Sequence, residues 1–258
     1  MKVGDTIERS YITSEVAKIV GVHSNTVRMY EELSLIPKPE RCKNGYRVFG
    51  DKHVDQFKVA RTAFQIEILQ NGLRKKIITA VKLSSDSRYD EAITLINEYI
   101  TCVETEIKNA DEAVAITREL LQGINQDNNI FLKRKDVSEL LDVTMDTLRN
   151  WEANGLLKVK RKENGYRVYT GEDISWLKII RSLKCANYSL SSILRMMNAL
   201  WKNENTNIEQ ALNTPNEDED IISVCDRLIV SLNAAKENAG QIIIMLTEMK
   251  AKYSNPPL

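Results

Sequence analysis

The chain of 258 residues contains few glycines, prolines, cysteines and aromatic residues. It has 10 Gly, 5 Pro and 4 Cys, and aromatic side chains make up 6% of it. Scarce glycine and proline, together with apolar residues at helical spacing, indicate a mainly α-helical chain. The sequence has no run of about 18 apolar residues, which argues against a membrane span. Its first residues lack the apolar segment of a signal peptide, so we expect a cytoplasmic protein with no membrane partner.

Features that would indicate a metal site or an enzyme are also missing. The four cysteines form no CxxC pair and share no metal-ligand spacing with a histidine, which favours a reduced protein without a cofactor. We find no paired carboxylates, nucleophile and base, or phosphate-binding loop, so we do not expect an enzyme. His23 and His53 have no acid/base partner in the sequence pattern, and we expect both at the surface.

The net charge of zero conceals a segregation of charge along the chain. Residues 1–80 and residues 130–201 each carry a net charge of +5, whereas residues 81–129 carry −6 and residues 202–258 carry −4. Basic segments suit a polyanionic partner, and acidic segments do not. Two separate parts of the chain are therefore candidates for binding nucleic acid.

These two basic parts contain an internal repeat. Residues 27–31 read Val-Arg-Met-Tyr-Glu and residues 148–152 read Leu-Arg-Asn-Trp-Glu. Each stretch is followed by Asn-Gly-Tyr-Arg-Val and an aromatic residue, at 44–49 and at 164–169. The two copies correspond with an offset of 121 before the Gly-Tyr-Arg turn and 120 after it. The second hairpin is therefore one residue shorter.

Each copy predicts two helices joined by a tight turn, a basic hairpin and two further helices. The first helix begins at a capping Thr13 or Ser14 and ends at Gly21, a position that suits a left-handed backbone. Asn-Gly dipeptides predict the hairpin turns. The other helices of the first copy are expected at 24–33, 52–70 and 73–83, and those of the second at 131–141, 144–154, 173–185 and 190–200.

A long helix with a heptad pattern follows each copy. Apolar residues step by alternating threes and fours over 29 residues, roughly 43 Å at 1.5 Å per residue. Two seams of equal length in one chain predict that the two helices pair with each other. The first seam is Ile93, Ile96, Ile100, Val103, Ile107, Ala110, Val114, Thr117 and Leu121. The second is Ile221, Cys225, Leu228, Leu232, Ala235, Ala239, Ile242, Leu246 and Met249.

Two helices followed by a basic hairpin form a winged helix-turn-helix, a module that binds double-stranded DNA. The first residues of its second helix lie in the major groove and face the bases. Asn pairs with adenine, Asp accepts from cytosine N4, and Met or a Thr methyl group contacts thymine. The base-facing residues are His23, Ser24, Asn25 and Thr26 in the first copy, and Thr144, Met145, Asp146 and Thr147 in the second.

Other basic and aromatic residues are expected to hold the DNA backbone. They are Arg28, Tyr30, Arg149 and Trp151 in the second helices, and Arg41, Lys43, Arg47, Lys160, Arg161, Lys162 and Arg167 in the wings. Two alternatives stay open. Tyr30 and Trp151 could be core aromatics, and Arg28 and Arg149 could pair with Glu31 or Glu152 on their own helices. The wing residues Tyr46 and Tyr166 fit a core position at least as well as a DNA contact.

The repeated motifs resemble the MerR (mercury-resistance regulator) family of bacterial transcription regulators. Each resemblance covers about 70 residues, and the helix after it looks like the dimerisation helix of that family. The residues that carry it are 12–13, 16–17, 21–22, 26–31, 35–37 and 44–49 in the first copy. In the second they are 143, 147–152, 155–157, 164–169, 177–183 and 188–190.

The resemblance implies a two-fold dimer through antiparallel long helices that binds a pseudopalindromic promoter element, bends and untwists it, and acts with RNA polymerase. It also implies backbone contacts for Arg28, Tyr30, Arg47, Arg149 and Arg167, and for Trp151. The sequence departs from the family at His23, where a Ser or Thr cap is usual, and at Lys158, where Pro is usual. Cysteine clusters of the sensing members are missing, since Cys102 lies off the seam and Cys225 lies on it. Cys225 is most simply a small core residue, and the sequence does not identify a small-molecule effector.

We expect a mainly α fold with two winged helix-turn-helix domains, each followed by a long coiled-coil helix, in an intrachain antiparallel pseudo-dimer. The expected segments are 1–83 and 130–201 for the DNA-binding domains, and 90–122 and 219–252 for the long helices. The chain would then act as a monomer with two heads about 34 Å apart, one DNA turn. An intermolecular homodimer with four heads is the competing geometry.

The leading functional hypothesis is a sequence-specific transcription regulator that reads an asymmetric pseudopalindromic promoter element with two non-identical heads. One alternative is an architectural or recombination-directionality factor that bends DNA without sensing a ligand. Another is a helical interaction scaffold, against which the basic wings count. If the protein is a regulator or an architectural factor, its affinity for DNA should fall steeply between about 50 and 200 mM salt.

Overall fold

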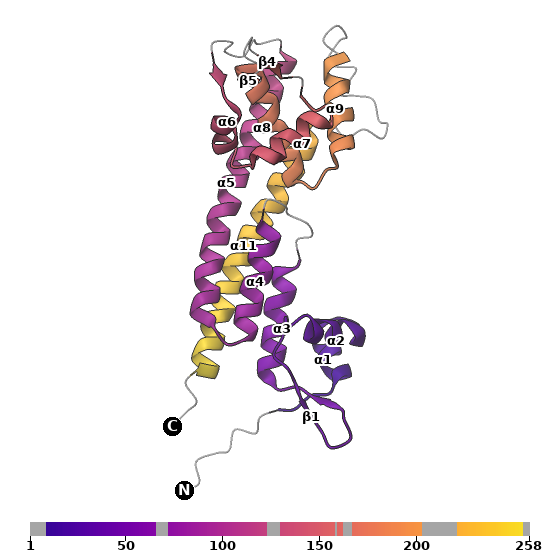
Figure 1. The fold of residues 1–258 in the computed structure, drawn as a ribbon. Helices are drawn as coiled ribbons and strands as arrows, with labels where there is room; N and C mark the ends of the chain where they lie inside the picture. The colour runs from indigo at the N-terminus through magenta and orange to yellow at the C-terminus, as the bar shows by residue number, and fades with distance from the viewer. Residues whose placement is uncertain are drawn as a thin grey trace. The chain divides into compact units, whose positions relative to one another are not determined.

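The computed structural model describes residues 9–65, 72–122, 130–157, 159–161, 167–202 and 221–254 (Figure 1). The described chain is mainly helical, as the sequence predicts, and its strands are two to four residues long. It divides into two compact units. Unit 1 comprises residues 1–67, 72–103 and 234–258, and unit 2 comprises residues 68–71 and 104–233. Each unit therefore contains one copy of the repeat, called head 1 and head 2 below.

Head 1 has the predicted order of helix, turn, helix, hairpin and two helices. Gly21 ends the first helix with φ +67°, and its N–H donates to the carbonyl of Ala17. No side chain of Thr13 or Ser14 caps that helix; instead the Glu15 carboxylate accepts from the Ile12 N–H at 2.9 Å. The elements are α1 (Thr13–Val20), α2 (Ser24–Glu32), β1 (Glu40–Arg41), β2 (Arg47–Val48), α3 (Asp51–Ala63) and α4 (Leu73–Ser85).

The core of head 1 fixes the position of α2. The rings of Tyr30 on α2 and Phe57 on α3 stack with their centroids 4.8 Å apart. Buried Gln56 donates to the carbonyls of Leu35 and Val81, at 3.0 Å each, which joins the end of the helix-turn-helix to α4. The predicted third helix ends seven residues early, at Ala63, and residues 66–71 lie outside the described part.

Head 2 repeats this order and adds a strand. Its elements are β3 (Phe131–Leu132), α6 (Arg134–Leu140), α7 (Met145–Ala153), β4 (Lys160–Arg161), β5 (Arg167–Thr170), α8 (Gly171–Cys185) and α9 (Leu190–Lys202). The prediction of a helix from residue 131 is wrong, because Phe131 and Leu132 pair antiparallel with Thr170 and Tyr169 in the sheet order β3-β5-β4. In head 1 the corresponding contact is a single bridge between Tyr11 and Phe49.

The core of head 2 is continuous with the adjoining parts of the long helices. A single cluster of buried side chains includes Leu148 and Trp151 of α7, Leu177 and Ile180 of α8, and Val114 of α5. Arg181 of α8 forms a buried bidentate ion pair with Glu106 of α5, at 2.6 and 2.8 Å. Arg181 Nε also donates to the Leu141 carbonyl at 2.7 Å, so one side chain holds together α5, α8 and the end of α6.

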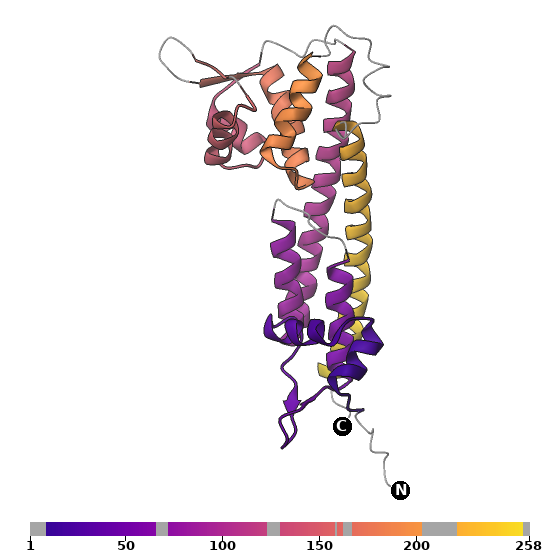
Figure 2. The same cartoon turned by 90° about the vertical axis from the view of Figure 1, so that its right-hand side faces the viewer.

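The two long helices are α5 (Tyr89–Leu121) and α11 (Ile221–Ser254), and each contributes to both units (Figures 1 and 2). In α11, every seam position from Cys225 to Met249 is buried, as the heptad pattern predicts. In α5, Ile93, Ile100 and Ile107 are only half-buried, while Tyr99 and Glu106 are buried outside the predicted seam.

The difference arises because α5 also packs against helices of the heads. In unit 1, Lys76 of α4 forms an ion pair with Glu98 at 2.8 Å. In unit 2, α8 approaches α5 through the Lys178–Glu112 ion pair at 2.6 Å and through Ser182, whose hydroxyl donates to the Asn109 carbonyl. These partners rotate the buried face of α5 away from a simple two-helix seam. Among the described helices, none combines the length and the apolar character needed to cross a membrane.

Opposite ends of α5 and α11 meet within each unit. In unit 1, Lys250 near the end of α11 forms an ion pair with Asp90 at the start of α5, at 2.6 Å. Both views draw these segments side by side (Figures 1 and 2). In unit 2, Val224 and Cys225 near the start of α11 share the buried cluster with Val114 and Ile116 of α5. Each unit is thus built on two oppositely directed helix segments.

Candidate nucleic-acid interface

The recognition helix of head 1 is α2, and its first turn is presented to solvent. His23 caps the helix, because its Nδ1 accepts from the Asn25 N–H at 3.2 Å. The departure from a Ser or Thr cap therefore keeps the capping function. Asn25 is exposed, and Ser24 and Thr26 are half-buried. The predicted base-facing set thus lies at one helix end, with the Asn25 amide accessible.

The recognition helix of head 2 is α7, which begins in the same way. The Thr144 hydroxyl accepts from the Thr147 N–H at 3.1 Å and caps the helix. Met145 and Asp146 are exposed, and Thr147 is half-buried. The two heads therefore present chemically different side chains, an amide in one and a carboxylate in the other, from the same position of the same motif.

One arginine on each recognition helix lies one turn further on and is exposed. Arg28 donates to the Asn25 side chain at 3.4 Å, and Arg149 forms an ion pair with Asp146 at 2.5 Å. The alternative in which these arginines pair with Glu31 or Glu152 is wrong, since both find partners three residues earlier. Their exposure leaves both guanidinium groups accessible to a phosphate.

The aromatic residues of the two recognition helices belong to the cores. Tyr30 is 6% exposed and Trp151 is 4% exposed. Tyr30 lies between Phe57 and the edge of Phe64. The structure thus favours the alternative in which both rings are core aromatics over their expected contact with the DNA backbone. Leu33, the residue that follows the last turn of α2, is 49% exposed.

The wing arginines are bound by the glutamates of the recognition helices. Arg47 pairs with Glu31 in head 1, and Arg167 pairs with Glu152 in head 2, at 2.5 Å in the second case. Arg41 lies 3.7 Å from Glu31 and is half exposed. The Glu that ends each repeated Arg-x-aromatic-Glu motif therefore anchors the wing to the recognition helix. The sequence reasoning gave these two glutamates no such role.

Head 2 strengthens this anchor with two residues that the sequence reasoning missed. Arg134 donates to both oxygens of Glu152, at 2.7 and 2.9 Å, and the Tyr169 hydroxyl donates to the same carboxylate at 2.6 Å. Burial acts to raise the pKa of Glu152, but hydrogen bonds from Tyr169 and Arg134 outweigh it, so the pKa is lowered. Burial and the bond to Glu152 raise the pKa of Tyr169 to about 12. At the equivalent positions, head 1 has Thr13 and Phe49 instead of Arg134 and Tyr169. This difference between the two copies was the only sign in the sequence that head 2 has additional partners for its glutamate.

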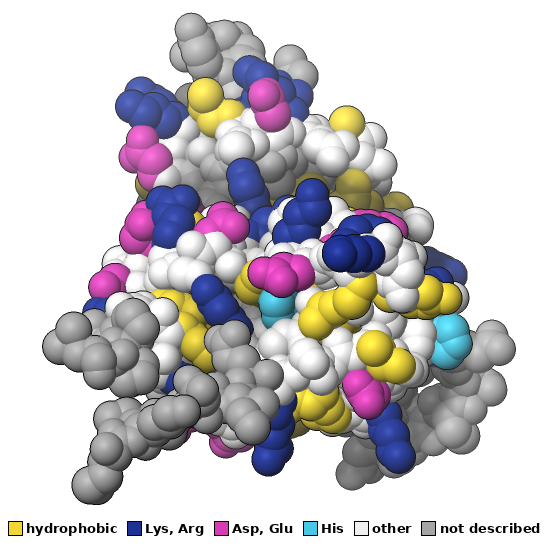
Figure 3. Space-filling model, turned by 90° about the horizontal axis from the view of Figure 1, so that it is seen from below, with side chains coloured by type: hydrophobic (Ala, Val, Ile, Leu, Met, Phe, Trp, Pro, Cys, Tyr) yellow, Lys and Arg dark blue, Asp and Glu magenta, His cyan; other side chains and the backbone are white. Residues whose placement is uncertain are grey.

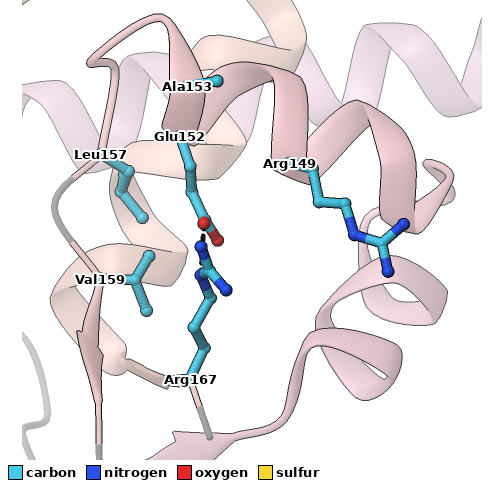
Figure 4. Close-up of a pocket in the computed structure, with 6 residues that line it drawn as sticks. All are labelled: Arg149, Glu152, Ala153, Leu157, Val159 and Arg167. Carbon is cyan, nitrogen blue, oxygen red and sulfur yellow. Dashed lines mark ion pairs between the residues drawn. The ribbon is translucent and has the colours of Figure 1, made fainter. Parts of the chain in front are cut away.

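A hollow of about 280 Å³ lies between the recognition helix and the wing of head 2. Figure 4 shows Glu152 and Arg167 pointing toward each other across it, while the Arg149 side chain extends away from them. The apolar side is formed by Ala153, Leu157 and Val159. The cations beside this hollow are each held by a carboxylate in the free protein.

The wing of head 1 is exposed and basic toward its tip. Arg41, Lys43 and Tyr46 are exposed, and Tyr46 at 70% contradicts the core position that we considered for it. Figure 3 shows Lys and Arg side chains distributed among apolar and polar ones on the face that it displays. In head 2, Lys160 and Arg161 form β4. The side chains of these two residues, with Lys158, Lys162 and Tyr166, lie outside the described part.

Cys185, Cys225 and His53 occupy ordinary structural positions. Cys185 and Cys225 are buried, and burial raises the pKa of the Cys185 thiol to about 12, which keeps it protonated. In the residues described, no three His, Cys, Asp or Glu side chains are grouped so as to hold a metal ion. His53 is half-buried rather than at the surface, and its Nδ1 accepts from the Gly50 N–H. Burial lowers its pKa.

The two heads are winged helix-turn-helix domains, each built from a capped recognition helix and a hairpin anchored to it by a glutamate. Comparison with known families specifies them further. Residues 13–49 match the MerR family regulatory protein model, and residues 132–200 match the model of the MerR HTH family regulatory protein. The chain therefore carries two segments in tandem that match MerR-family models.

The chain is also similar to proteins that are named as regulators. The chain is 42% identical over 53 residues to the HTH-type transcriptional regulator CueR of Escherichia coli O157:H7, which covers 20% of this chain and 39% of that protein. It is 36% identical over 61 residues to the mercuric resistance operon regulatory protein of Bacillus cereus, covering 24% and 46%. It is 32% identical over 71 residues to the HTH-type transcriptional regulator AdhR of Bacillus subtilis, covering 27% and 51%.

The chain thus spans between about two fifths and half of the length of these relatives. No solved structure matches it significantly.

Proposed function

We propose that this protein is a DNA-binding transcription regulator that reads an asymmetric pseudopalindromic promoter element with its two non-identical heads. The observation that carries the proposal is the pair of winged helix-turn-helix domains with different residues at the same base-facing position, Asn25 in head 1 and Asp146 in head 2. The names of the relatives, which are transcriptional regulators, support the regulatory part. The family consists of regulatory proteins rather than enzymes.

Each head would bind DNA by inserting its recognition helix into the major groove. Asn25 offers an amide that matches adenine, and Asp146 offers an acceptor for the N4 amine of cytosine. Arg28, Arg149 and the exposed wing of head 1 would neutralise phosphates, and contacts of this kind position the helices on the duplex. The glutamate anchors hold each wing at a fixed angle to its recognition helix, so that helix and wing approach the duplex as one body.

We further propose that the two heads act as an intrachain pseudo-dimer, because oppositely directed segments of α5 and α11 are packed together in each unit. The Lys250–Asp90 ion pair in unit 1 and the shared burial of Val224 and Val114 in unit 2 support this arrangement. One chain then supplies what two subunits supply in a symmetric dimer. Since its heads differ in sequence, its preferred operator has unlike half-sites.

The proposed distortion of the promoter, and action together with RNA polymerase there, rest on the family resemblance alone. A bend-angle measurement on the bound operator, by energy transfer between dyes at the two duplex ends, tests the distortion. We expect a shorter end-to-end distance in the complex than in free DNA. An unchanged distance would remove distortion from the proposal and leave DNA binding intact.

The experiment that tests the function is a selection of bound sequences from random duplex DNA with the full chain. We expect two recovered half-sites of different sequence at a fixed spacing, and binding that weakens steeply between about 50 and 200 mM salt. Recovery of no preferred sequence, with salt-dependent binding preserved, would instead favour an architectural DNA-bending role. Binding that ignores salt would exclude both.

A further inference from the structure

The same two positions on the recognition helices carry pairs that differ in charge. In head 1, Arg28 lies 3.4 Å from the neutral Asn25 amide, a long hydrogen bond. In head 2, Arg149 lies 2.5 Å from the Asp146 carboxylate. Both pairs have the same three-residue spacing and are exposed to solvent. The two heads therefore differ in one chemical group beside the arginine. It is a neutral amide in head 1 and a carboxylate, which attracts the guanidinium group, in head 2.

The acidic residue one turn further along α7, Glu152, is already occupied by partners other than Arg149. Glu152 already accepts hydrogen bonds from Arg134 and Tyr169 and is paired with Arg167. Figure 4 shows the Arg149 side chain directed away from Glu152 and Arg167. Asp146 is thus the anion that holds Arg149 in the free protein, and it also reduces the positive potential of the surface that would meet phosphates.

We propose that Asp146 restrains Arg149, so that head 2 grips the DNA backbone only where Asp146 meets an exocyclic amine of cytosine or adenine. This inference rests on the proposed DNA-binding function and assigns specificity to one residue of it. A carboxylate in the major groove is repelled by the flanking phosphates unless a base N–H donor satisfies it. Once a base amine binds Asp146, Arg149 loses its competitor and is free to neutralise a phosphate.

Head 1 has no such restraint, because the Asn25 amide carries no charge. Arg28 therefore reaches a phosphate on any sequence, and head 1 contributes most of the non-specific affinity. Head 2 contributes discrimination, because on a wrong sequence it presents an unsatisfied carboxylate and an arginine already in use. The two heads thus divide the tasks of holding DNA and of testing its sequence.

The test measures dissociation constants across 50–200 mM salt for two duplexes, the selected operator and the same duplex with the head 2 half-site scrambled. The chains compared are the wild type, Asp146→Asn and the reciprocal Asn25→Asp. Asp111→Asn is the control, because Asp111 is exposed on α5 and its loss changes the net charge of the chain by the same amount. Each phosphate contact adds about 0.9 to the slope of log affinity against log salt.

For Asp146→Asn we expect affinity for the scrambled duplex to rise up to about fivefold, the scale of an exposed ion pair, with a slope steeper by about 0.9. Affinity for the operator should not rise, so discrimination falls. Asn25→Asp should weaken binding to both duplexes and reduce the slope on each by about 0.9. Asp111→Asn should leave discrimination between the two duplexes as in the wild type.

The restraint would be overturned if Asp146→Asn raised affinity for the scrambled duplex no more than Asp111→Asn does, or if it lowered that affinity in a variant whose circular dichroism spectrum matches the wild type. A folding defect lowers affinity, so it cannot imitate the expected gain. If the wild type itself binds neither duplex, the proposed function fails. If the wild type binds both and Asp146→Asn preserves discrimination, only the role of Asp146 fails.

Discussion

The buried ion pair between Glu106 and Arg181 should be the most costly single contact to break in unit 2. The two side chains are 7% and 8% exposed, and the bidentate contact is joined by the bond from Arg181 to the Leu141 carbonyl. Glu106→Gln keeps the shape of the side chain but leaves a buried guanidinium without its counter-charge. Removal of one partner of such a pair costs about 3–5 kcal/mol of unfolding free energy.

Lys178–Glu112 is the matched control for this prediction, because it also joins α8 to α5 in unit 2 but is partly exposed at both ends. Glu112→Gln should cost less than about 1 kcal/mol. Tryptophan fluorescence during urea unfolding is the assay, since Trp151, Trp176 and Trp201 all belong to unit 2. A loss of less than about 1 kcal/mol for Glu106→Gln would refute the argument that this pair ties head 2 to α5.

A second variant separates the charge from the packing. The double substitution of Glu106 by Leu and Arg181 by Met removes both charges while keeping the site filled with side chains. It should recover much of the stability lost in Glu106→Gln, because an apolar replacement of a buried ion pair is often neutral or stabilising. If the double variant is as unstable as the single one, then packing rather than an uncompensated charge explains the loss.

Three further predictions concern the two heads. Arg28→Ala should weaken binding to every duplex alike and reduce the salt slope by about 0.9, as measured by fluorescence anisotropy; a sequence-dependent loss would contradict a backbone role. Asn25→Ala should relax base preference in one half-site only, which a repeated selection would detect; equal relaxation in both would oppose unlike half-sites. The lowered pKa of Glu152 means that its stabilising contribution is present above its unfolded pKa and is lost as pH falls through the folded pKa. Acid unfolding followed by tryptophan fluorescence should therefore lose this pH-dependent component in Glu152→Gln, and an unchanged profile would contradict it.

The sequence was sufficient to predict the features that depend on local periodicity. Gly21 takes the predicted left-handed conformation, and the α11 seam is buried from Cys225 to Met249. Both outcomes follow from the backbone and from spacing along one helix, which the sequence states directly. The match of both repeats to one family of DNA-binding domains likewise depended on residues close together in the chain.

Features that depend on tertiary partners were predicted poorly. Tyr30 has an aromatic ring and a polar hydroxyl, and only its stacking on Phe57 decides in favour of the core. Phe131 follows a helical pattern, but pairing with Thr170 makes it part of a strand. The α5 seam departs from its heptads because α8 supplies a further packing surface, which Arg181 reaches from 75 residues away in sequence.

The glutamate anchors were missed for the same reason. Glu31 and Glu152 suggest partners on their own helices, three or four residues away, whereas their partners Arg47 and Arg167 lie on the wings. In both copies the same Glu and the same Arg recur at the same separation within one residue. A pairing between repeated residues was thus available in the sequence, although only the folded hairpin brings the two side chains together.

The central claim is that one chain with two different heads occupies one asymmetric operator. Native mass spectrometry of the full chain bound to the selected duplex tests it most directly. The account predicts a complex containing a single chain of 29.5 kDa per duplex, and a smaller fraction of duplex in that complex when either half-site is scrambled. A complex that contains two chains per duplex, or one that is indifferent to scrambling of one half-site, would contradict it.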